Sequence, residues 1–383
     1  MRLTDAPVPA APVGRRHARF HTLTVAEVRP LTADAIEVTF DVPDELADAY
    51  SYAAGQYIAI RADLDGEQVR RTYSICQAPA RRSLKVGIKR DMGGLFSPWA
   101  VDHLAPGMSL DVMSPEGLFV SHRAPGQGGR VVGVAAGSGI TPMMSLVEQT
   151  LGSDAESTFD LVYSNRTTID AMFVDELADL KDRYPTRLAL HHVLTRERRG
   201  SELLSGRLDV DRFRRIVTAL IGPDDVAEWF LCGPFEVVQM CRDVLTELGV
   251  PRERVRHELF TTGRADRPTA PRGAPPASGG PGGPDGSGGE SCSIAFRLDS
   301  TTATVKTPAG ARESVLNAAL RVRGDVPFAC TNGVCGTCRA KLVSGTVEMT
   351  ENYALEPEEL ARGYILTCQA IPTSKEITVD YDS

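Results

Sequence analysis

Residues 330–338 read CTNGVCGTC, and a fourth cysteine, Cys368, follows in the run TCQA. Four residues separate Cys330 from Cys335, and two separate Cys335 from Cys338. The intervening residues are small or are glycine, which lets the backbone approach a bound group closely. The stretch therefore predicts a loop that wraps around an inorganic centre and holds it through thiolates.

The spacing C-x4-C-x2-C with a distant fourth cysteine is typical of a loop that holds a [2Fe–2S] cluster. A structural zinc site is one alternative, but such sites are usually built from two C-x-x-C pairs. Here a single cysteine follows the loop. A disulfide framework is the weaker alternative, because no secretory signal is readable. We predict a [2Fe–2S] cluster whose ligands are Cys330, Cys335, Cys338 and Cys368.

The composition limits the class of protein. At 383 residues the chain is long enough for two or three domains. Its formal net charge of −8 argues against a nucleic-acid or anionic-membrane surface, because both need a basic footprint. No run of about 20 apolar residues predicts a membrane-spanning helix. We expect a cytoplasmic protein with reduced thiols and with neither a nucleic-acid nor a membrane partner.

A stretch rich in glycine and proline, residues 263–291, interrupts the chain. It has almost no large apolar side chain, so it cannot bury enough surface to fold. As a flexible coil it would span roughly 30 Å. We predict a disordered linker that tethers residues 292–383 to the larger N-terminal part. Residues 1–19 are expected to form a flexible tail.

The three remaining parts have different patterns of residues. Residues 20–125 contain short alternating or β-branched runs such as AIEVTFDV and SLKVGIKR, which predict an antiparallel β-barrel. Residues 126–262 alternate strand and helix patterns, which predicts a parallel α/β sheet. Residues 292–383 have the order strand, strand, helix, strands, as in a small β-grasp domain. The chain is therefore predicted to be a multidomain α+β protein.

Two segments of the barrel carry candidate cofactor contacts. Residues 71–74 read RTYS at a strand end, where Arg suits a pyrophosphate, Tyr a flat ring and Ser a ring nitrogen. An ordinary strand end is the alternative for this run alone. Gly93 and Gly94 precede a helix that starts SPWAVDHL. N–H groups at a helix start favour an anion.

The α/β part carries two further candidates. In VVGVAAGSGITPMMS, Gly137-Ser138-Gly139 stands between a strand and a helix. Thr141 is expected at the N-cap of that helix and Pro142 at its first position. Residues 232–234 read CGP after the strand EWFL, at the edge of the sheet where α/β domains bind ligands. A small buried hydrophobe is the alternative for Cys232.

Together these motifs resemble those of the ferredoxin–NADP reductase superfamily. Its FAD barrel has a strand similar to RTYS and a helix start similar to GGLFS, and its nicotinamide-nucleotide loop is similar to GSGITP. The resemblance implies that Arg71 and Ser97 face the FAD pyrophosphate, and that Tyr73 stacks on the isoalloxazine. It also implies that Ser74 approaches the flavin N5 and that Phe260 covers the other face of the ring.

The resemblance implies a full set of site residues. The implied FAD contacts are Arg71, Thr72, Tyr73, Ser74, Gly87, Ile88, Lys89, Gly93, Gly94, Leu95, Phe96, Ser97 and Phe260. The implied nicotinamide-nucleotide contacts are Gly137, Ser138, Gly139, Thr141, Pro142, Ser164, Asn165, Arg166, Thr195, Arg196, Cys232, Gly233 and Pro234. Ser74, Cys232 and Glu258 are expected to be catalytic, with Cys232 near the nicotinamide and Glu258 orienting Ser74.

The choice of electron donor depends on the ribose 2′ position, where an acid suits a hydroxyl and Arg suits a phosphate. Ser164-Asn165-Arg166 follows the second strand of the α/β part, and Thr195-Arg196 follows a later one. Both arginines could instead be solvated. Because these positions hold no acid, the sequence favours NADPH over NADH.

The order of parts, flavin first and ferredoxin last, resembles the reductase components of bacterial multicomponent oxygenases. Longer runs such as VYSNRT, HHVLTRE and EMTENYALEPEELARGYILTCQ are similar to the reductase subunits of phenylacetyl-CoA epoxidases. This resemblance implies that electrons pass from NADPH through FAD and the cluster, singly, to an iron oxygenase of phenylacetate degradation. One alternative is the reductase of a 3-ketosteroid or other ring or alkane hydroxylase. A different one is a [2Fe–2S] redox-sensing module.

The linker suggests how the cluster reaches that partner. A tether keeps the cluster domain at an effective concentration of order millimolar near the flavin while leaving it free to visit another protein. Acidic residues of the C-terminal domain could steer that docking, or they could simply form a solvated face. They are Glu348, Glu351, Glu356, Glu358 and Glu359.

Overall fold

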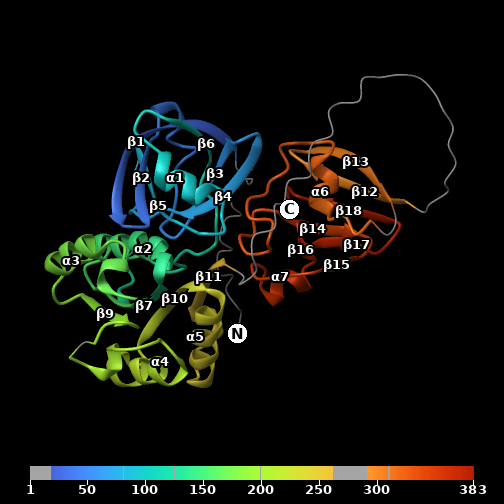
Figure 1. Cartoon of the computed structure of the whole chain (residues 1–383). Coiled ribbons are helices and arrows are strands. Elements are labelled where there is room, and N and C mark those ends of the chain that lie inside the picture. Colours follow the sequence, from blue (N-terminus) through green and yellow to red (C-terminus); the bar gives the residue numbers. More distant parts are fainter. Residues whose placement is uncertain (1–18, 81, 125, 199, 262–290, 309–310) are drawn as a thin grey trace, which may run out of the picture.

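The described residues of the computed structural model form three large β-sheets with their covering helices and one two-stranded sheet (Figure 1). The structure describes residues 19–80, 82–124, 126–198, 200–261, 291–308 and 311–383. The predicted tail and nearly all of the predicted linker lie outside the described residues. No described helix is long and apolar enough to cross a membrane.

The first six strands form one antiparallel sheet in the order β4-β3-β6-β1-β2-β5. Their bounds are β1 (Phe20–Thr32), β2 (Ala35–Asp41), β3 (Tyr57–Leu64), β4 (Glu67–Ser74), β5 (Ser83–Lys89) and β6 (Ser109–Met113). A bridge from Ile75 to Val86 joins the two ends of this order, so the sheet closes into a barrel. The short turn η1 (Asp44–Leu46) precedes β3, and helix α1 (Phe96–His103) inserts the fully buried Phe96 into the barrel core.

The second sheet has five parallel strands in the order β11-β10-β7-β8-β9. Its strands are β7 (Gly129–Ala136), β8 (Ser157–Asn165), β9 (Leu188–Leu194), β10 (Val226–Pro234) and β11 (Val255–Thr261). Helices α2 (Ile140–Ser153) and α3 (Val174–Arg183) pack with one apolar cluster, and α4 (Val210–Ile216) and α5 (Phe235–Glu247) pack with another. The helices therefore cover both faces of the sheet. Short helical turns complete this part: η2 (Gly137–Gly139), η3 (Thr168–Asp170), η4 (Glu202–Leu204), η5 (Val217–Ile221) and η6 (Arg252–Arg254).

The helix after β7 begins earlier than the sequence suggested. Gly139 takes the N-cap position with helical backbone angles, and Ile140 is the first residue of α2. Thr141 lies inside the first turn and donates its hydroxyl hydrogen bond to the carbonyl of Ser138 at 3.1 Å. The predictions that Thr141 caps the helix and that Pro142 is its first residue are both wrong. Because the turn η2 runs directly into α2, Thr141 and Pro142 are the second and third residues of the helix.

The third sheet has the order β13-β12-β18-β14-β16, and β15 and β17 form a separate pair. The strands are β12 (Ser291–Leu298), β13 (Thr301–Pro308), β14 (Arg339–Ser344), β15 (Val347–Met349), β16 (Tyr364–Leu366), β17 (Ala370–Pro372) and β18 (Glu376–Asp380). The helices are α6 (Val315–Leu320) and α7 (Pro357–Ala361). Strands β12 and β18 are parallel and the other pairs are antiparallel, so the sheet is mixed and the predicted β-grasp arrangement is confirmed.

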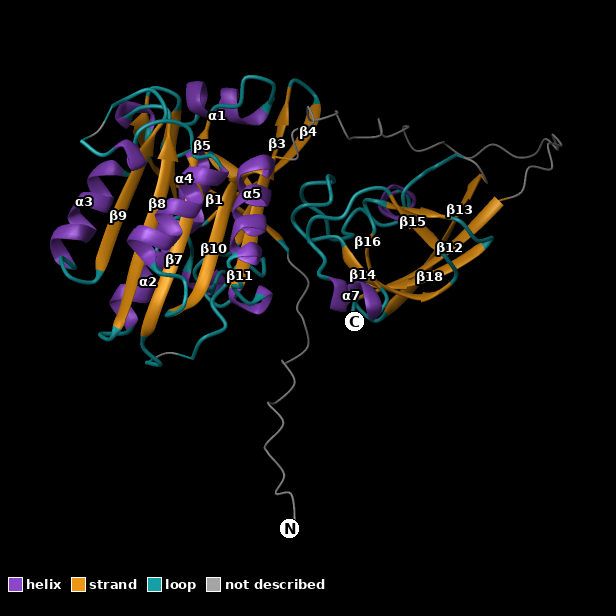
Figure 2. Cartoon of the chain, turned by 90° about the horizontal axis from the view of Figure 1, so that it is seen from below, coloured by secondary structure: helices purple, strands orange, loops and turns teal. Residues whose placement is uncertain are grey.

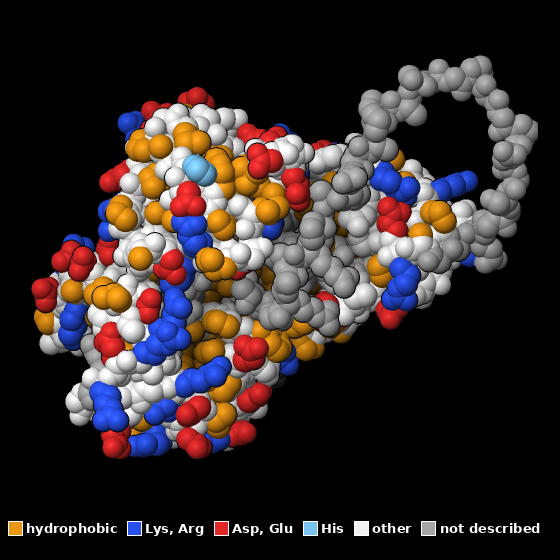
Figure 3. All heavy atoms as spheres, in the orientation of Figure 1, with side chains coloured by type: hydrophobic (Ala, Val, Ile, Leu, Met, Phe, Trp, Pro, Cys, Tyr) orange, Lys and Arg blue, Asp and Glu red, His pale blue; other side chains and the backbone are white. Residues whose placement is uncertain are grey.

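The first two parts share a core. One apolar cluster contains Ala54 and Phe119 from the barrel side together with residues of α2, α3, β7 and β8. The backbone N–H of Gly55 donates to the Ser145 hydroxyl at 3.0 Å, and that of Ala78 donates to Glu148 at 2.7 Å. The third part lies beside β3, β4 and β11 as a separate lobe (Figure 2). On the face drawn in Figure 3, basic and acidic side chains are interspersed.

Candidate functional site

The four predicted cluster ligands come from two segments of the C-terminal domain. Cys330, Cys335 and Cys338 lie in the loop between α6 and β14, and Cys368 follows β16. The thiols gather in two hydrogen-bonded pairs, the first two cysteines in one pair and the last two in the other. Gly333 and Gly336 adopt φ values of 76° and 70°, which favour glycine and let the loop curl around the thiols.

The pairing suits a centre with two metal ions. The hydrogen bond from Cys330 lowers the pKa of Cys335 to about 6, and the hydrogen bond with Cys368 raises the pKa of Cys338 well above its usual range. The first pair therefore favours a thiolate at Cys335 beside a thiol at Cys330. No three His, Cys, Asp or Glu side chains of the described residues converge on a single-ion site. Two pairs of sulfurs fit a two-iron cluster, whose irons divide four ligands between them.

Residues that sequence reasoning missed hold the two segments together. The Thr367 hydroxyl donates to the carbonyl of Cys338 at 2.8 Å and contacts the Tyr381 hydroxyl at 3.1 Å. The side-chain amide of Gln369 donates to the carbonyl of Thr331 at 2.7 Å. These bonds join the two ligand-bearing segments. No sequence pattern marks Thr367, Gln369 or Tyr381, because their roles depend on contacts across the fold.

The predicted flavin contacts lie at the end of β4 and at the start of α1. The rings of Tyr73 and Phe96 are 5.8 Å apart, so the strand and the helix start are neighbours. The Ser97 hydroxyl accepts a hydrogen bond from the backbone of Asp91 at 3.0 Å and fastens the glycine turn to the helix. Arg71 lies two residues before Tyr73 on the same strand. A guanidinium, the N–H groups of a helix start and a half-buried aromatic ring fit a flavin nucleotide.

The other predicted flavin contacts differ in how far their side chains are accessible, and Ile88 and Phe96 can act only through their backbone. The side chains of Ile88 and Phe96 are fully buried in the barrel core. The Lys89 ammonium lies 3.4 Å from the Asp34 carboxylate, next to the nucleotide domain. Thr72 and Leu95 are partly or largely exposed, and Gly93 has open space where a Cβ would lie.

The three residues predicted to be catalytic meet where the first two domains join. Ser74 ends β4 of the barrel, and its hydroxyl donates to the Glu258 carboxylate on β11 at 2.9 Å. Cys232 on β10 is directly opposite Glu258 in the parallel sheet. Burial raises the pKa of Glu258 to about 7 and raises that of Cys232 well above its usual range. Phe260 lies two residues beyond Glu258 and packs against the shared core.

The glycine turn η2 is wedged between β10 and the barrel. A Cβ on Gly139 would lie 2.2 Å from the carbonyl oxygen of Cys232, so only glycine fits there. A Cβ on Gly87 of β5 would lie 2.7 Å from the Thr141 methyl group. By contrast, a Cβ on Gly137 would meet nothing within 4 Å. The turn therefore presents an open glycine at the carboxyl edge of the sheet, close to Cys232. Ser138 is the middle residue of this turn, and Pro142, Gly233 and Pro234 flank it.

The residues predicted to contact the ribose also lie together. The backbone N–H groups of Thr195 and Arg196 donate to the carbonyls of Asn165 and Arg166 at 3.0 and 2.8 Å. Ser164 precedes Asn165 at the carboxyl end of β8, and the Asn165 side-chain nitrogen is buried without a hydrogen-bond partner among the described residues. Such an orphaned donor fits a bound nucleotide.

Arg166 is half exposed and already has acidic neighbours. Its guanidinium lies 3.8 Å from the Asp34 carboxylate and 3.6 Å from that of Asp170. Asp34 belongs to the turn between β1 and β2, so the barrel contributes to the surroundings of the predicted 2′ site. No sequence pattern indicates this contact.

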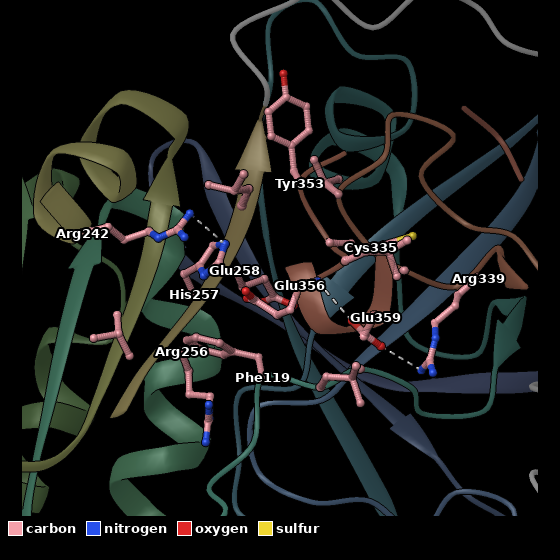
Figure 4. A pocket seen from close by; sticks show the side chains of 18 of the residues that line it. Phe119, Arg242, Arg256, His257, Glu258, Cys335, Arg339, Tyr353, Glu356 and Glu359 are labelled. Carbon is pink, nitrogen blue, oxygen red and sulfur yellow. Dashed lines mark hydrogen bonds and ion pairs between the residues drawn. The ribbon is translucent and has the colours of Figure 1, made fainter. Parts of the chain in front are cut away.

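A cavity of about 780 Å³ separates α5 and β11 from the cluster loop (Figure 4). Glu258 and Cys335 both line it, so the predicted flavin site and the predicted cluster are neighbours. The charge of Cys335 adds to the effect of burial on the raised pKa of Glu258. Burial beside Arg242 lowers the pKa of His257 to about 4. The convergent residues can therefore bring a reduced nucleotide, a flavin and a one-electron centre within one small region.

Family models match all three parts of the chain. Residues 22–120 match the oxidoreductase FAD-binding domain and residues 134–243 the oxidoreductase NAD-binding domain. Residues 297–373 match the 2Fe-2S iron-sulfur cluster binding domain. The predicted FAD, nicotinamide-nucleotide and [2Fe–2S] cofactors are confirmed at this level.

Relatives are similar over nearly the whole chain. One subunit of the 1,2-phenylacetyl-CoA epoxidase of Escherichia coli (strain K12) is 40% identical, over 95% of this chain and 98% of that protein. The ferredoxin reductase component of the 3-ketosteroid-9-alpha-monooxygenase of Rhodococcus rhodochrous is 32% identical, over 94% and 96%. The structure of phthalate dioxygenase reductase shares the fold, with a TM-score of 0.56 and 22% identity over 94% of this chain and 98% of the other.

The three cofactor domains and these relatives are consistent with the geometry of the site, in which Ser74 is hydrogen-bonded to Glu258 and Glu258 lines the same cavity as Cys335. The chain therefore belongs to the family of multicomponent-oxygenase reductase components that join FAD-binding, NAD-binding and [2Fe–2S] domains.

Proposed function

We propose that this reductase takes electrons from NADPH and delivers them singly to an iron oxygenase that resembles phenylacetyl-CoA epoxidase. The observation that carries the proposal is the meeting of Ser74, Cys232 and Glu258 beside a cavity that Cys335 also lines. Identity over nearly the whole chain is 40% to the phenylacetyl-CoA epoxidase protein and 32–34% to the ketosteroid reductases, which favours the first kind of partner.

The domain boundaries are part of the same proposal. We assign residues 20–125 to the FAD domain, 126–262 to the nucleotide domain and 292–383 to the cluster domain, with 1–19 and 263–291 as tail and linker. None of the eight cysteines, all of which are described, forms a disulfide, which supports a location in the reducing cytoplasm.

When bound, the nucleotide, the flavin and the cluster supply the redox chemistry, two electrons at a time on one side and one at a time on the other. Arg71 and the N–H groups before α1 bind the flavin pyrophosphate. Tyr73 orients the ring against β4. The GSG turn η2 and the orphaned Asn165 amide bind the nicotinamide nucleotide, and the buried Cys232 excludes water from its ring.

Glu258 accepts or returns a proton through its hydrogen bond with the Ser74 hydroxyl. Because the pKa of Glu258 lies at about 7, its carboxyl group can accept or return a proton near neutral pH. The hydrogen bond of 2.9 Å from Ser74 is the route between that carboxyl group and the predicted flavin N5. Cys330, Cys335, Cys338 and Cys368 hold the cluster.

The test is an absorption spectrum of the purified protein followed by anaerobic titration with NADPH and, separately, with NADH. We expect flavin and [2Fe–2S] bands that bleach with a small excess of NADPH and that need more NADH. A properly folded, cofactor-loaded protein that stays oxidised with both nucleotides would disprove the proposed donor chemistry.

The partner is tested by reconstitution. The reductase is mixed with a purified phenylacetyl-CoA epoxidase oxygenase or with a 3-ketosteroid hydroxylase oxygenase, and product is measured against NADPH consumed. Coupled turnover with the first oxygenase and uncoupled NADPH oxidation with the second is the expected result. The reverse pattern would assign the chain to the steroid system.

A further inference from the structure

One buried phenol joins the barrel to the cluster loop. Tyr57 begins β3, and its hydroxyl donates to the carbonyl of Cys335 at 2.7 Å. The same hydroxyl lies 2.6 Å from that of Thr337, which in turn lies 3.1 Å from the Cys335 sulfur. The Tyr57 side chain is only 4% exposed. A residue of the flavin domain therefore contacts a cluster ligand directly through hydrogen bonds.

Tyr57 also stands next to the predicted flavin contacts. It is directly opposite Ser74 in the antiparallel pair of β3 and β4. Side chains of directly opposed residues lie on the same face of a sheet, about 5 Å apart at Cβ. The Ser74 hydroxyl is bonded to Glu258, which shares the cavity wall with Tyr57 and Cys335. Tyr57 therefore lies between the residues predicted to contact the flavin N5 and the cluster loop.

Three further contacts hold the cluster domain at the rims of this interface. On the barrel side, the Arg70 guanidinium lies 3.9 Å from the ring centre of Phe328 and donates to its carbonyl at 3.3 Å. On the nucleotide-domain side, Arg252 pairs with Glu356 at 2.9 Å. There the rings of Phe235 and Tyr353 also meet edge to face, 5.5 Å apart.

This interface differs from the one between the first two domains and allows the cluster domain to move away from them. The first two domains share a continuous apolar core, whereas the cavity of about 780 Å³ lies between the two rims of the cluster-domain interface. Around the cavity the contacts are a mixture of hydrogen bonds, ion pairs and small apolar contacts, such as those of Ala329 with Tyr57 and Met113 and of Val334 with the core of the nucleotide domain. These apolar contacts are small and separate and do not form one continuous core. Polar interfaces between domains of one chain allow relative motion unless they are large and apolar.

We propose that this arrangement is the electron-transfer state between the flavin and cluster domains, and that Tyr57 is the positioning residue that sets it. The proposal rests on the proposed function. With both cofactors bound, this state would allow the reduced flavin to give one electron to the cluster, the flavin losing one electron and the cluster gaining one. No bond forms or breaks. Because Tyr57 covers the Cys335 side of the loop, delivery to the oxygenase from that side follows separation of the rims.

The first experiment compares Tyr57→Phe with Tyr52→Phe in the full-length, cofactor-loaded protein. Tyr52 is a matched control because its hydroxyl donates to the carbonyl of Ala78 at 2.9 Å, within the N-terminal part. Hydrogen exchange of residues 328–338 reports how often the loop is released. Stopped-flow absorbance reports the ratio of the cluster-reduction rate to the flavin-reduction rate.

Tyr57→Phe is expected to speed the exchange of residues 328–338 about tenfold, the equilibrium effect of one lost hydrogen bond. The ratio of the two reduction rates should fall as well, but by less than the exchange rises, because the rate ratio follows the docked fraction while exchange follows the released fraction. Tyr52→Phe should leave both quantities at the wild-type values. The proposal would be overturned if Tyr57→Phe showed the same hydrogen exchange of residues 328–338 and the same rate ratio as the wild type. Equal changes in the two tyrosine variants would also overturn it.

If Tyr57→Phe loses its cluster, a second test swaps the charges of the Arg252–Glu356 pair on the nucleotide-domain side of the interface. Arg252→Glu and Glu356→Arg should each speed loop exchange about two- to fivefold, because the pair is exposed, and the double variant should restore it. Failure of the double variant to restore the exchange would contradict the interface. Exchange needs no nucleotide, so this result is independent of whether NADPH reduces the flavin.

Discussion

At the scale of the residue, the site depends on side chains that are far apart in the chain. Ser74, Cys232 and Glu258 come from the barrel and from two strands of the nucleotide domain, and they meet at one junction. Burial there makes a carboxyl group titrate near neutrality. The same junction leaves Arg166 between two aspartates, one of which belongs to the barrel.

The raised pKa of Glu258 predicts a pH-dependent stability. Burial raises this pKa to about 7 from an ordinary 4.5, so the folded protein binds more protons than the unfolded chain between these values. The stabilisation is complete below pH 4.5 and is lost as the pH rises through 7, by up to about 3 kcal/mol. The urea midpoint of unfolding should therefore fall between pH 5 and pH 8, and it should fall further in wild type than in Glu258→Gln. Glu253→Gln, at an exposed position, should follow wild type; identical pH dependence in Glu258→Gln would contradict the prediction.

Arg166 predicts the preference for the electron donor. If its guanidinium binds a 2′-phosphate, Arg166→Asp should raise the KM for NADPH about 10- to 100-fold and change that for NADH far less. Steady-state reduction of ferricyanide measures both constants. Arg215→Asp, at an exposed position on α4, is the matched control and should change neither. Equal increases for both nucleotides would show that Arg166 does not read the phosphate.

At the scale of the element, the turn η2 shows how closely a loop must fit to make a site. It passes so near the end of β10 that a single methyl group on Gly139 would overlap the Cys232 carbonyl. The same turn starts α2, which packs against the barrel through Ser145. One short turn therefore positions the nucleotide loop, Cys232 and the domain junction together.

Two glycines of the same segment should respond oppositely to alanine. Gly139→Ala would force the backbone of η2 or β10 to shift, with an expected loss of about 2 kcal/mol or more and weaker nucleotide binding. Gly152→Ala, near the end of α2, would meet only the Tyr184 hydroxyl at 3.9 Å. It should stabilise the protein by up to about 1 kcal/mol. Urea unfolding and nucleotide titration of both variants test this; a harmless Gly139→Ala would show that the turn can relax.

At the scale of the whole molecule, two kinds of domain contact coexist. The barrel and nucleotide domain share a buried core and buried hydrogen bonds. The cluster domain has its own core and meets the other two through polar contacts and small apolar contacts around a cavity. This difference divides the chain into one rigid pair and one separable lobe.

Unfolding should therefore occur in two transitions, one for the first two domains together and one for the cluster domain. Ser145→Ala removes the acceptor of a buried Gly55 N–H, so it should lower the first transition by about 1–3 kcal/mol and leave the second in place. Urea unfolding followed by flavin fluorescence and by cluster absorbance separates the two. A single transition, or a shift of both in Ser145→Ala, would contradict this division.

Much of the fold and of the ligand set could be predicted from the sequence. The strand and helix patterns of the three parts recur in the structure, and the four cysteines lie in two paired segments. Family models confirm the three cofactor classes. The expected capping role of Thr141 was wrong, because the local signal for a cap was overridden by a turn that leads into the helix. The individual flavin and nucleotide contacts stay predictions.

The sequence by itself determined the order of the domains, the prediction of a four-cysteine cluster site and the glycine turns, because strand periodicity, cysteine spacing and turn residues act over a few neighbouring positions. Only the tertiary structure decided that Glu258 meets Ser74, that Asp34 meets Arg166 and that Tyr57 reaches Cys335. These contacts join residues between about 130 and 280 positions apart, and they depend on how three cores pack, which no local pattern encodes.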